Sequence, residues 1–310
     1  MKKQRRCILA AAIAGTLLTL RPAFPAVDTS PSPATAQLVI TVQSAHGGTP
    51  ANLHREDLMV LENGARVPIT GLQKLTGDQA GMQLFVLLDD STRSSSLSIH
   101  LPELKAFVNS LPATTQVAIG YMRNGGFSLD QGFTTHHEQA ANALRLPESI
   151  PGTNGSPYFA LSYLVNHWPS KQQTGRRAVL MLTDGVDRYY TSSPVDDPYV
   201  DAAIGDAQKK NVIVYSIYLR GAGLYPGTTW GVTLAQSRLS QVSQQTGGYA
   251  YFEGLISPVA ISPFLKDLDE RLDNQYKVTF EARNTHGPQR VTLRTELPGL
   301  KIDAQQRIYL

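Results

Sequence analysis

Two short apolar segments that each end in an acid constrain this chain more than any other feature. Residues 178–182 are all apolar, and the segment runs through a threonine into Asp184. Residues 84–88 are likewise all apolar and run into Asp89. Short, continuously apolar runs are typical of strands inside a parallel sheet that is covered on both faces. The carboxyl ends of such strands meet at one edge, so the pattern predicts an α/β domain with acids gathered there.

Strand and helix patterns alternate from about residue 82 to residue 274, which predicts a doubly wound, mostly parallel sheet with helices on both faces. We expect strands at 83–89, 115–122, 127–133, 177–183, 211–219 and 249–253. We expect helices at 99–111, 135–146, 157–168, 198–210, 232–245 and 260–273. Pro102 is tolerated in a first helical turn, so the first of these helices should begin close to it.

The first 26 residues have the three parts of a secretory signal peptide: a basic start, an apolar run and a small-residue exit ending at Ala26. The apolar run is shorter than the roughly 20 residues that span a membrane. We therefore expect cleavage, no membrane span afterwards, and a periplasmic or secreted protein, with a retained anchor as the alternative. The sole cysteine is Cys7, so the mature chain would have no disulfide.

The net charge of +3 belongs to this leader. The first 26 residues hold five basic residues and no acid, which leaves 23 basic against 25 acidic residues in the remainder. A mature net charge of −2 gives no reason to expect nucleic-acid binding.

The expected α/β domain, residues 82–274, is flanked by β patterns. Residues 27–37 are rich in Pro, Ser, Thr and Ala and read as a linker. An N-terminal β segment at 38–76 contains Asn63-Gly64, a strong hairpin signal. A C-terminal β segment at 275–310 alternates in period two. Three short strands at each end are too few to stand alone, which suggests a joint β appendage.

The two acid-ended strands resemble those of the von Willebrand factor A domain and its metal-ion-dependent adhesion site. The family motif is Asp-x-Ser-x-Ser after the first strand, a threonine from a middle loop and an aspartate after the fourth strand. Asp184 matches the last of these. Counting from Asp89 gives Asp89 and Ser91, with Arg93 in place of the second serine.

Other assignments of the motif remain open. Counting from Asp90 gives Asp90, Thr92 and Ser94, which fits by residue type but shifts the register by one. The middle-loop residue is Thr153 or Ser156. Ser156 also reads as a helix cap, because a proline follows it.

Further stretches resemble an exported variant of this superfamily that is abundant in Acidobacteria, with a β segment before the A domain and a β tail behind it. The resemblance covers residues 36 to 310 and implies the fold, but no established activity. The stretches are 156–162, 197–203, 215–223, 239–248 and 274–276.

The sequence contains none of the usual signs of an enzyme. It has no Gly-x-Ser-x-Gly elbow, no P-loop and no His-Glu-x-x-His motif. The segment 221–227 imitates part of a dinucleotide fingerprint, but Pro226 stands where the third glycine belongs. We expect neither catalysis nor nucleotide binding. With Tyr225 and Trp230, this loop instead predicts an exposed recognition surface.

The resemblance implies an exported protein-recognition module. Asp89, Ser91, Asp184 and Thr153 would hold Mg²⁺ or Mn²⁺, and an acidic side chain of a partner protein would complete the coordination. One rival is a degenerate site in which Arg93 replaces the metal and attracts the partner's acid. Another is a metal-independent structural protein of the cell envelope. A hydrolase with an unrecognised site is the third.

Overall fold

The computed structural model describes residues 34–91, 94–150, 155–172, 174–189, 196–219, 229–252, 260–284 and 286–310. All of these residues belong to one compact unit, Pro33–Leu310. The expected signal peptide, residues 1–26, lies outside the described residues. Among the helices that are described, none has the length and apolarity needed to cross a membrane.

A six-stranded sheet forms the centre of the α/β part, as the alternating pattern predicted. Its strands are β5 (Met82–Asp89), β6 (Thr115–Arg123), β7 (Gly126–Thr134), β8 (Arg177–Thr183), β9 (Val212–Tyr218) and β10 (Ala250–Phe252). The strand order is β10-β9-β8-β5-β6-β7. All neighbours are parallel except β6 and β7, which are antiparallel. The predicted fold class, a mostly parallel sheet, is confirmed.

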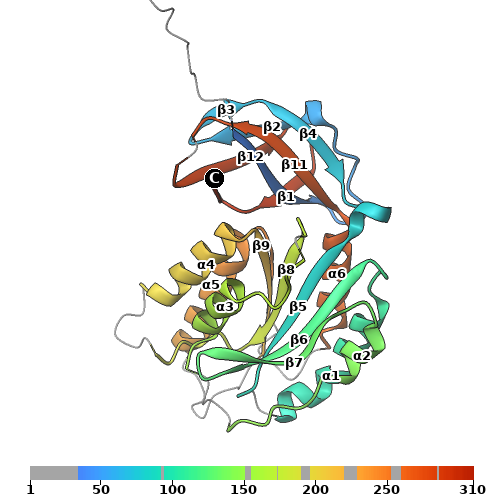
Figure 1. Cartoon of the computed structure of the whole chain (residues 1–310), viewed down its shortest axis with the longest axis vertical. Helices are drawn as coiled ribbons and strands as arrows, with labels where there is room; N and C mark the ends of the chain where they lie inside the picture. Colours follow the sequence, from blue (N-terminus) through green and yellow to red (C-terminus); the bar gives the residue numbers. More distant parts are fainter. Residues whose placement is uncertain are drawn as a thin grey trace, which may run out of the picture. The chain divides into compact units, whose positions relative to one another are not determined.

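Helices cover both faces of this sheet (Figure 1). They are α1 (Ser94–Ser110), α2 (His137–Asn142), α3 (Pro157–Asn166), α4 (Pro198–Lys209), α5 (Thr229–Gln245) and α6 (Ser262–Asp273). Residues of α1, α2 and α6 share one core cluster with the sheet, and residues of α3, α4 and α5 share the other. Buried side chains therefore alternate between two apolar layers along each central strand.

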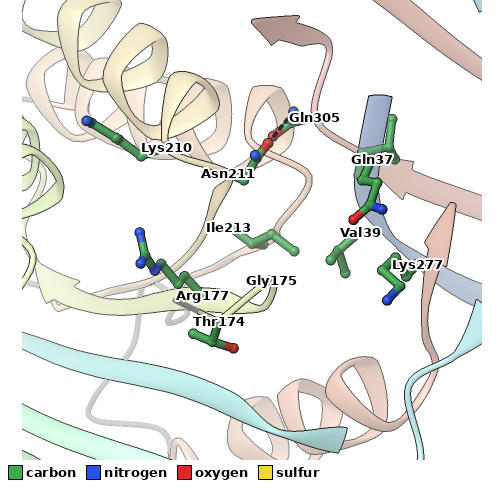
Figure 2. Close-up of a pocket in the computed structure, with 11 residues that line it drawn as sticks. Gln37, Val39, Thr174, Gly175, Arg177, Lys210, Asn211, Ile213, Lys277 and Gln305 are labelled. Carbon is green, nitrogen blue, oxygen red and sulfur yellow. Dashed lines mark hydrogen bonds between the residues drawn. The ribbon is translucent and has the colours of Figure 1, made fainter. Parts of the chain in front are cut away.

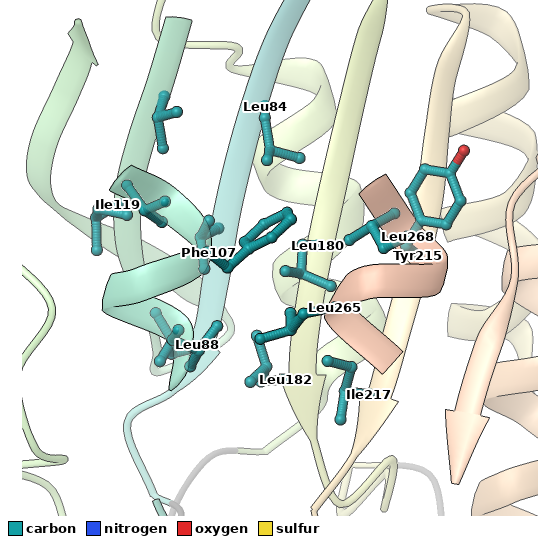
Figure 3. Packing of buried hydrophobic residues seen from close by; sticks show 14 of the residues in the cluster. Leu84, Leu88, Phe107, Ile119, Leu180, Leu182, Tyr215, Ile217, Leu265 and Leu268 are labelled. Carbon is teal, nitrogen blue, oxygen red and sulfur yellow. The ribbon is translucent and has the colours of Figure 1, made fainter. Parts of the chain in front are cut away.

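The strand β8 shows how this alternation works. Leu180 and Leu182 face the first layer, where they pack with Leu265 of α6 (Figure 3). Val179 and Met181 face the second layer. All four side chains are fully buried, which explains why the sequence of this strand is apolar without interruption.

Helix α1 starts earlier than predicted. It begins at Ser94, so Pro102 lies inside the helix and not in its first turn. The added turns place Leu97 and His100 in buried positions, each about 1% exposed. Burial of this face compensates for the backbone hydrogen bond that proline cannot donate. Helix α2 is shorter than expected, His137–Asn142 instead of 135–146.

The flanking β segments combine into two four-stranded antiparallel sheets. The strands are β1 (Ala34–Ser44), β2 (Leu58–Glu62), β3 (Ala65–Val67), β4 (Ile69–Lys74), β11 (Gln275–Ala282), β12 (Pro288–Thr295), β13 (Leu300–Ala304) and β14 (Arg307–Tyr309). One sheet has the order β13-β1-β11-β4 and the other β14-β12-β2-β3. Each sheet contains strands from both ends of the described chain, and both contribute to one apolar core.

Local details of these sheets follow from turn chemistry. Asn63 and Gly64 adopt φ values of 49° and 85°, as a two-residue hairpin between β2 and β3 requires. The strand expected from Leu38 already begins at Ala34, so residues 34–37 of the expected linker are paired with β11. Strands β4 and β13 were not predicted: β4 lacks a continuous period-two pattern, and the alternation of apolar and polar residues in β13 was overlooked.

A buried polar seam joins the flanking β1–β11 pair to the amino edge of the central sheet. It comprises Arg176, Gln275, Tyr215 and Thr41. The Arg176 guanidinium donates Nε to Gln275 Oε1 at 2.6 Å, Nη1 to the Ala80 carbonyl at 2.8 Å, and Nη2 to the Leu272 carbonyl. The Gln275 amide donates to Tyr215 and Thr41. Each of the three nitrogens of this guanidinium therefore donates a hydrogen bond.

Candidate metal and recognition site

The carboxyl ends of β5 and β8 lie side by side at the centre of the sheet. The two strands pair in parallel register up to Leu88 and Leu182. In the order of the sheet, β6 and β7 lie on the β5 side of this pair, whereas β9 and β10 lie on the β8 side. Such a switch point leaves a crevice outside the strand ends, and ligands of open α/β sheets bind there. The structure brings Asp89 and Asp184 to this position.

Asp89 is 1% exposed, and hydroxyl groups hold its carboxylate. Oδ1 accepts from the Ser91 amide at 3.0 Å and from Ser91 Oγ at 2.7 Å. Oδ2 accepts from Thr183 Oγ1 at 3.0 Å. Burial raises the pKa of Asp89, and the charge of Asp184 raises it further, while the bonds from Ser91 and Thr183 oppose both effects. No lysine or arginine of the described chain pairs with it.

Asp184, by contrast, has a cationic partner. Its Oδ2 accepts from Arg188 Nη2 at 2.7 Å, and its Oδ1 accepts from the Val186 amide at 3.0 Å. The turn between them needs glycine, because Gly185 has a φ of +67° and an added Cβ would lie 2.9 Å from Leu239. Sequence reasoning missed Arg188, because residues 184–188 are not helical and a spacing of four predicts contact only on a helix.

Ser156 connects the middle loop to the segment after β8. Its hydroxyl accepts from the Phe159 amide at 3.1 Å, which caps α3, and donates to Asp187 Oδ2. Asp187 is 4% exposed and also accepts from the Tyr189 amide, so its carboxylate is buried and bound to the loop that follows it. The structure thus brings Ser156 into the site. Thr153, the other middle-loop candidate, lies outside the described residues.

Asp197, which precedes α4, and Arg238 of α5 form a second buried ion pair. Arg238 Nη1 is 3.1 Å from Asp197 Oδ2, and Asp197 also caps α4 through the Tyr199 amide. Burial raises the pKa of Asp197, and the charge of Asp187 adds to this shift. The described site therefore contains four aspartates and two arginines, a formal net charge of −2. The residues counted are Asp89, Asp184, Asp187, Asp197, Arg188 and Arg238.

Asp90 belongs to a different cluster. Its carboxylate is fully buried and accepts from Arg123 and Arg145, each at 2.9 Å, from the Glu148 amide at 3.1 Å and from Ser149 Oγ at 2.6 Å. Burial alone would raise the pKa of Asp90, but these four hydrogen bonds outweigh it and lower the pKa to about 2.

If the motif is counted from Asp90, its first carboxylate is therefore already bound by Arg123 of β6 and by groups in residues 145–149. Of the other alternates in that register, Thr92 lies outside the described residues, as does Arg93. Ser94 is the first residue of α1. The structure brings Asp89 and Ser91, rather than Asp90, together with β8.

Exposed aromatic rings border the site. We call Phe159, Tyr163, Tyr189 and Tyr199 the aromatic surface. The first three are 40%, 43% and 51% exposed, and the rings of Phe159, Tyr189 and Tyr199 lie 5.5–6.4 Å apart in edge-to-face contacts.

Backbone contacts join the aromatic surface to the site. The ring of Tyr189 lies against Gly155, where any added Cβ would overlap it. The Gly155 carbonyl accepts from the amides of Arg188 and Tyr189 at 2.6 and 3.1 Å. The side chain of Tyr189 is therefore held next to the Asp184–Arg188 pair. In the loop expected to form a recognition surface, Trp230 is 64% exposed, and Tyr225 lies outside the described residues.

Solved structures that resemble this chain include three distant ones. No model of a known protein family matches the chain, and no curated protein matches it. An aerotolerance-related membrane protein from Bacteroides fragilis NCTC 9343, with multiple mutations to serine, is 12% identical over 62% of this chain and 99% of its own, with a TM-score of 0.42. BatB from Bacteroides thetaiotaomicron is 14% identical over 62% and 97%, also at 0.42. The N-terminal domain of TFIIH p34 is 16% identical over 61% and 96%, at 0.38. At TM-scores below 0.5, these likenesses add nothing to the assignment of function.

Proposed function

We propose that this protein is a non-catalytic recognition module that binds an acidic group of a partner protein through a divalent cation held by Asp89, Ser91 and Asp184. One observation carries the proposal. Asp89 is a buried carboxylate beside a second carboxylate, and among the described residues it has hydroxyl partners but no cation. A buried charge without a compensating partner is costly, and a bound cation would supply that partner.

The donor set suits a hard cation. The described residues include no group of three or more His, Cys, Asp or Glu that would make a metal site on its own. The site instead combines two carboxylates with the hydroxyl of Ser91, and Ser156 lies close by through Asp187. Oxygen donors of this kind are those of Mg²⁺ and Mn²⁺. When bound, such an ion supplies a coordination position that a partner's carboxylate can fill.

A metal-independent mode is the second candidate, and the Asp184–Arg188 contact favours it. The Arg188 side chain is 24% exposed, so its guanidinium can exchange Asp184 for a carboxylate of the partner. Arg188 would then have the role that the sequence suggested for Arg93. The two modes differ in one respect that can be measured directly: only the first requires a divalent cation.

The aromatic surface supports recognition of protein over recognition of a small ion alone. Exposed Tyr and Phe side chains are enriched at protein interfaces, because large rings bury much area at little entropic cost. Here they adjoin the proposed ion site through Gly155. We infer that the partner places an apolar or aromatic residue next to its acid.

Calorimetric titration with Mg²⁺ and Mn²⁺ tests the metal. We expect saturable binding that weakens at least about tenfold in Asp89→Asn and in Asp184→Asn, because each change removes a charged ligand. Asp201→Asn, an exposed position on α4, is the matched control and should bind as the wild type does. Saturating metal should also raise the free energy of unfolding, by about 2.7 kcal/mol at one hundred times Kd. Absence of binding in the wild-type protein would refute the metal mode.

Selection from a displayed random-peptide library tests the partner chemistry. In Mg²⁺ we expect enrichment of peptides with an Asp or Glu next to an aromatic residue, released by EDTA. Phe159→Ser should weaken these peptides several-fold without changing metal affinity, since Phe159 contacts no proposed ligand group except through its backbone amide. Acidic peptides that remain bound to the wild type in EDTA but do not bind the Arg188→Gln variant would support the metal-independent mode. Enrichment of peptides without acids would contradict both.

A further inference from the structure

A cavity of about 200 Å³ lies at the amino edge of the central sheet, opposite the edge that carries the candidate metal site. It is lined by residues of β1 and β11 on one side and by the starts of β8 and β9 on the other (Figure 2). Arg177 is the first residue of β8, and Asn211 immediately precedes β9. The metal site, at the carboxyl ends of β5 and β8, uses none of these residues.

The lining of this cavity is basic. It includes the cations Arg177, Lys210 and Lys277 and no Asp or Glu. Figure 2 shows Arg177 and Lys210 on one side of the cavity and Lys277 on the other, beside Val39. The remaining polar groups are the neutral side chains of Thr174, Gln37, Asn211 and Gln305. In the described chain, none of the three cations takes part in an ion pair.

Arg177 shows most clearly that a counter-charge is absent. Its Nε is buried and has no hydrogen-bond partner among the described residues. Its Nη2 makes a 3.4 Å contact with the Gln172 carbonyl, and the guanidinium carbon lies 5.7 Å from the centre of the Trp168 ring, but neither group carries a negative charge. Burial lowers the pKa of Arg177, and no neighbouring acid opposes this shift. The adjacent Arg176 is more deeply buried yet has three acceptors. One arginine is thus satisfied by the fold, and its neighbour is not.

We propose that this cavity binds a multiply charged oxyanion of the phosphate or sulfate class. Arginine offers a planar array of donors to such oxygens, and lysines act as point charges. Three cations from separate elements line one cavity whose lining contains no acid, so a group with more than one negative charge suits it better than a single carboxylate. The apolar walls from Val39 and Ile213 and the volume of about 200 Å³ limit the bound group to a small one.

The oxyanion has two chemical sources, a free ion or an ester carried on a larger molecule. Inorganic phosphate and sulfate represent the first, and glycerol phosphate represents the second. The cavity accepts a terminal phosphate in either case, so the relative affinities of these probes identify the source.

Titration of the purified chain with these probes, in buffer without divalent cations, tests the proposal. We expect saturable binding of at least one probe, weakened about tenfold or more by Lys277→Ala and by Arg177→Gln, because each removes a charge-assisted hydrogen bond. Lys209→Ala, on the exposed end of α4 next to Lys210, should leave the affinity unchanged. Thermal melts of each variant establish that it is folded, and Lys277→Ala serves alone if Arg177→Gln unfolds.

Two results would overturn the proposal. One is the absence of binding by phosphate, sulfate and glycerol phosphate. The other is binding with equal affinity in the wild type, Lys277→Ala and Lys209→Ala, which would place the anion elsewhere. Asp184 lies at the opposite edge of the sheet and does not line the cavity. The Asp184→Asn variant should therefore bind the probes as the wild type does. The test of the cavity is for this reason independent of the test of the metal site.

Discussion

Replacement of Asp90 by asparagine should lower the free energy of unfolding by about 3 kcal/mol, the usual cost of removing one member of a buried ion pair. The Asp90 carboxylate is fully buried and accepts from two arginines. Without it, Arg123 and Arg145 repel each other at the end of β6. Urea denaturation monitored by circular dichroism measures the effect.

The matched control is Glu148→Gln. Glu148 lies near the same two arginines, but its side chain is 62% exposed, so we expect a change below about 0.5 kcal/mol. The pH dependence supplies a second check. Because the pKa of Asp90 is lowered from 3.8 to about 2, its contribution is present above pH 3.8 and is lost as the pH falls towards 2. The difference between wild type and Asp90→Asn should shrink over the same interval. A difference that stays constant would mean that the carboxylate charge is not its source.

Adjacent arginines at the start of β8 should respond in opposite ways to the same substitution. Arg176→Met should destabilise the protein by about 3 kcal/mol or more, because it leaves the Ala80 and Leu272 carbonyls and the Gln275 side chain without their donor. Arg177→Met should be neutral or stabilising, since it removes a partly buried cation that has no counter-charge. Chemical denaturation of both variants in phosphate-free and sulfate-free buffer makes the comparison.

Repeating this comparison with added phosphate tests whether the cavity lined by Arg177 binds the ion. If the cavity binds phosphate, the ion should stabilise the wild-type protein by mass action and should stabilise Arg177→Met much less. The Arg176→Gln variant separates charge from hydrogen bonding at the seam: glutamine keeps a donor but cannot reach three acceptors, so we expect an intermediate loss. Equal destabilisation by Arg176→Met and Arg177→Met would show that the two environments do not differ in the way the hydrogen bonds indicate.

Much of the fold could be read from local patterns. The apolar runs that end in Asp89 and Asp184 predicted two buried parallel strands whose ends meet, and they do meet at the centre of the sheet. Asn63-Gly64 predicted a hairpin, and both residues adopt the required positive φ. These signals succeed because strand burial and turn conformation depend on residues a few positions apart. The early start of α1 was missed, since the burial that tolerates Pro102 comes from distant segments.

The candidate site was only half visible in the sequence. Its carboxylates and Ser91 were found by motif, but nothing local indicated that Asp90 would turn to Arg123 and Arg145, 33 and 55 residues away. Nor did it indicate that Asp187 would be buried against Ser156, 31 residues earlier. Both acids look alike in sequence to surface aspartates. Their surroundings, and therefore their hydrogen-bond partners, come from elements that pack on them after folding.

The sequence by itself determined the elements, their order and the residue types available at each strand end. Only the tertiary structure decided which of these residues meet. Thr41 and Gln275 are 234 residues apart and share a hydrogen bond, and Lys277 reaches the same cavity as Arg177 from a different sheet. Side-chain periodicity carries information over one helix or strand, whereas a seam or a cavity depends on the register between elements far apart in the chain. That register is set by packing of the whole core, so the basic cavity and its unsatisfied arginine appear only in three dimensions.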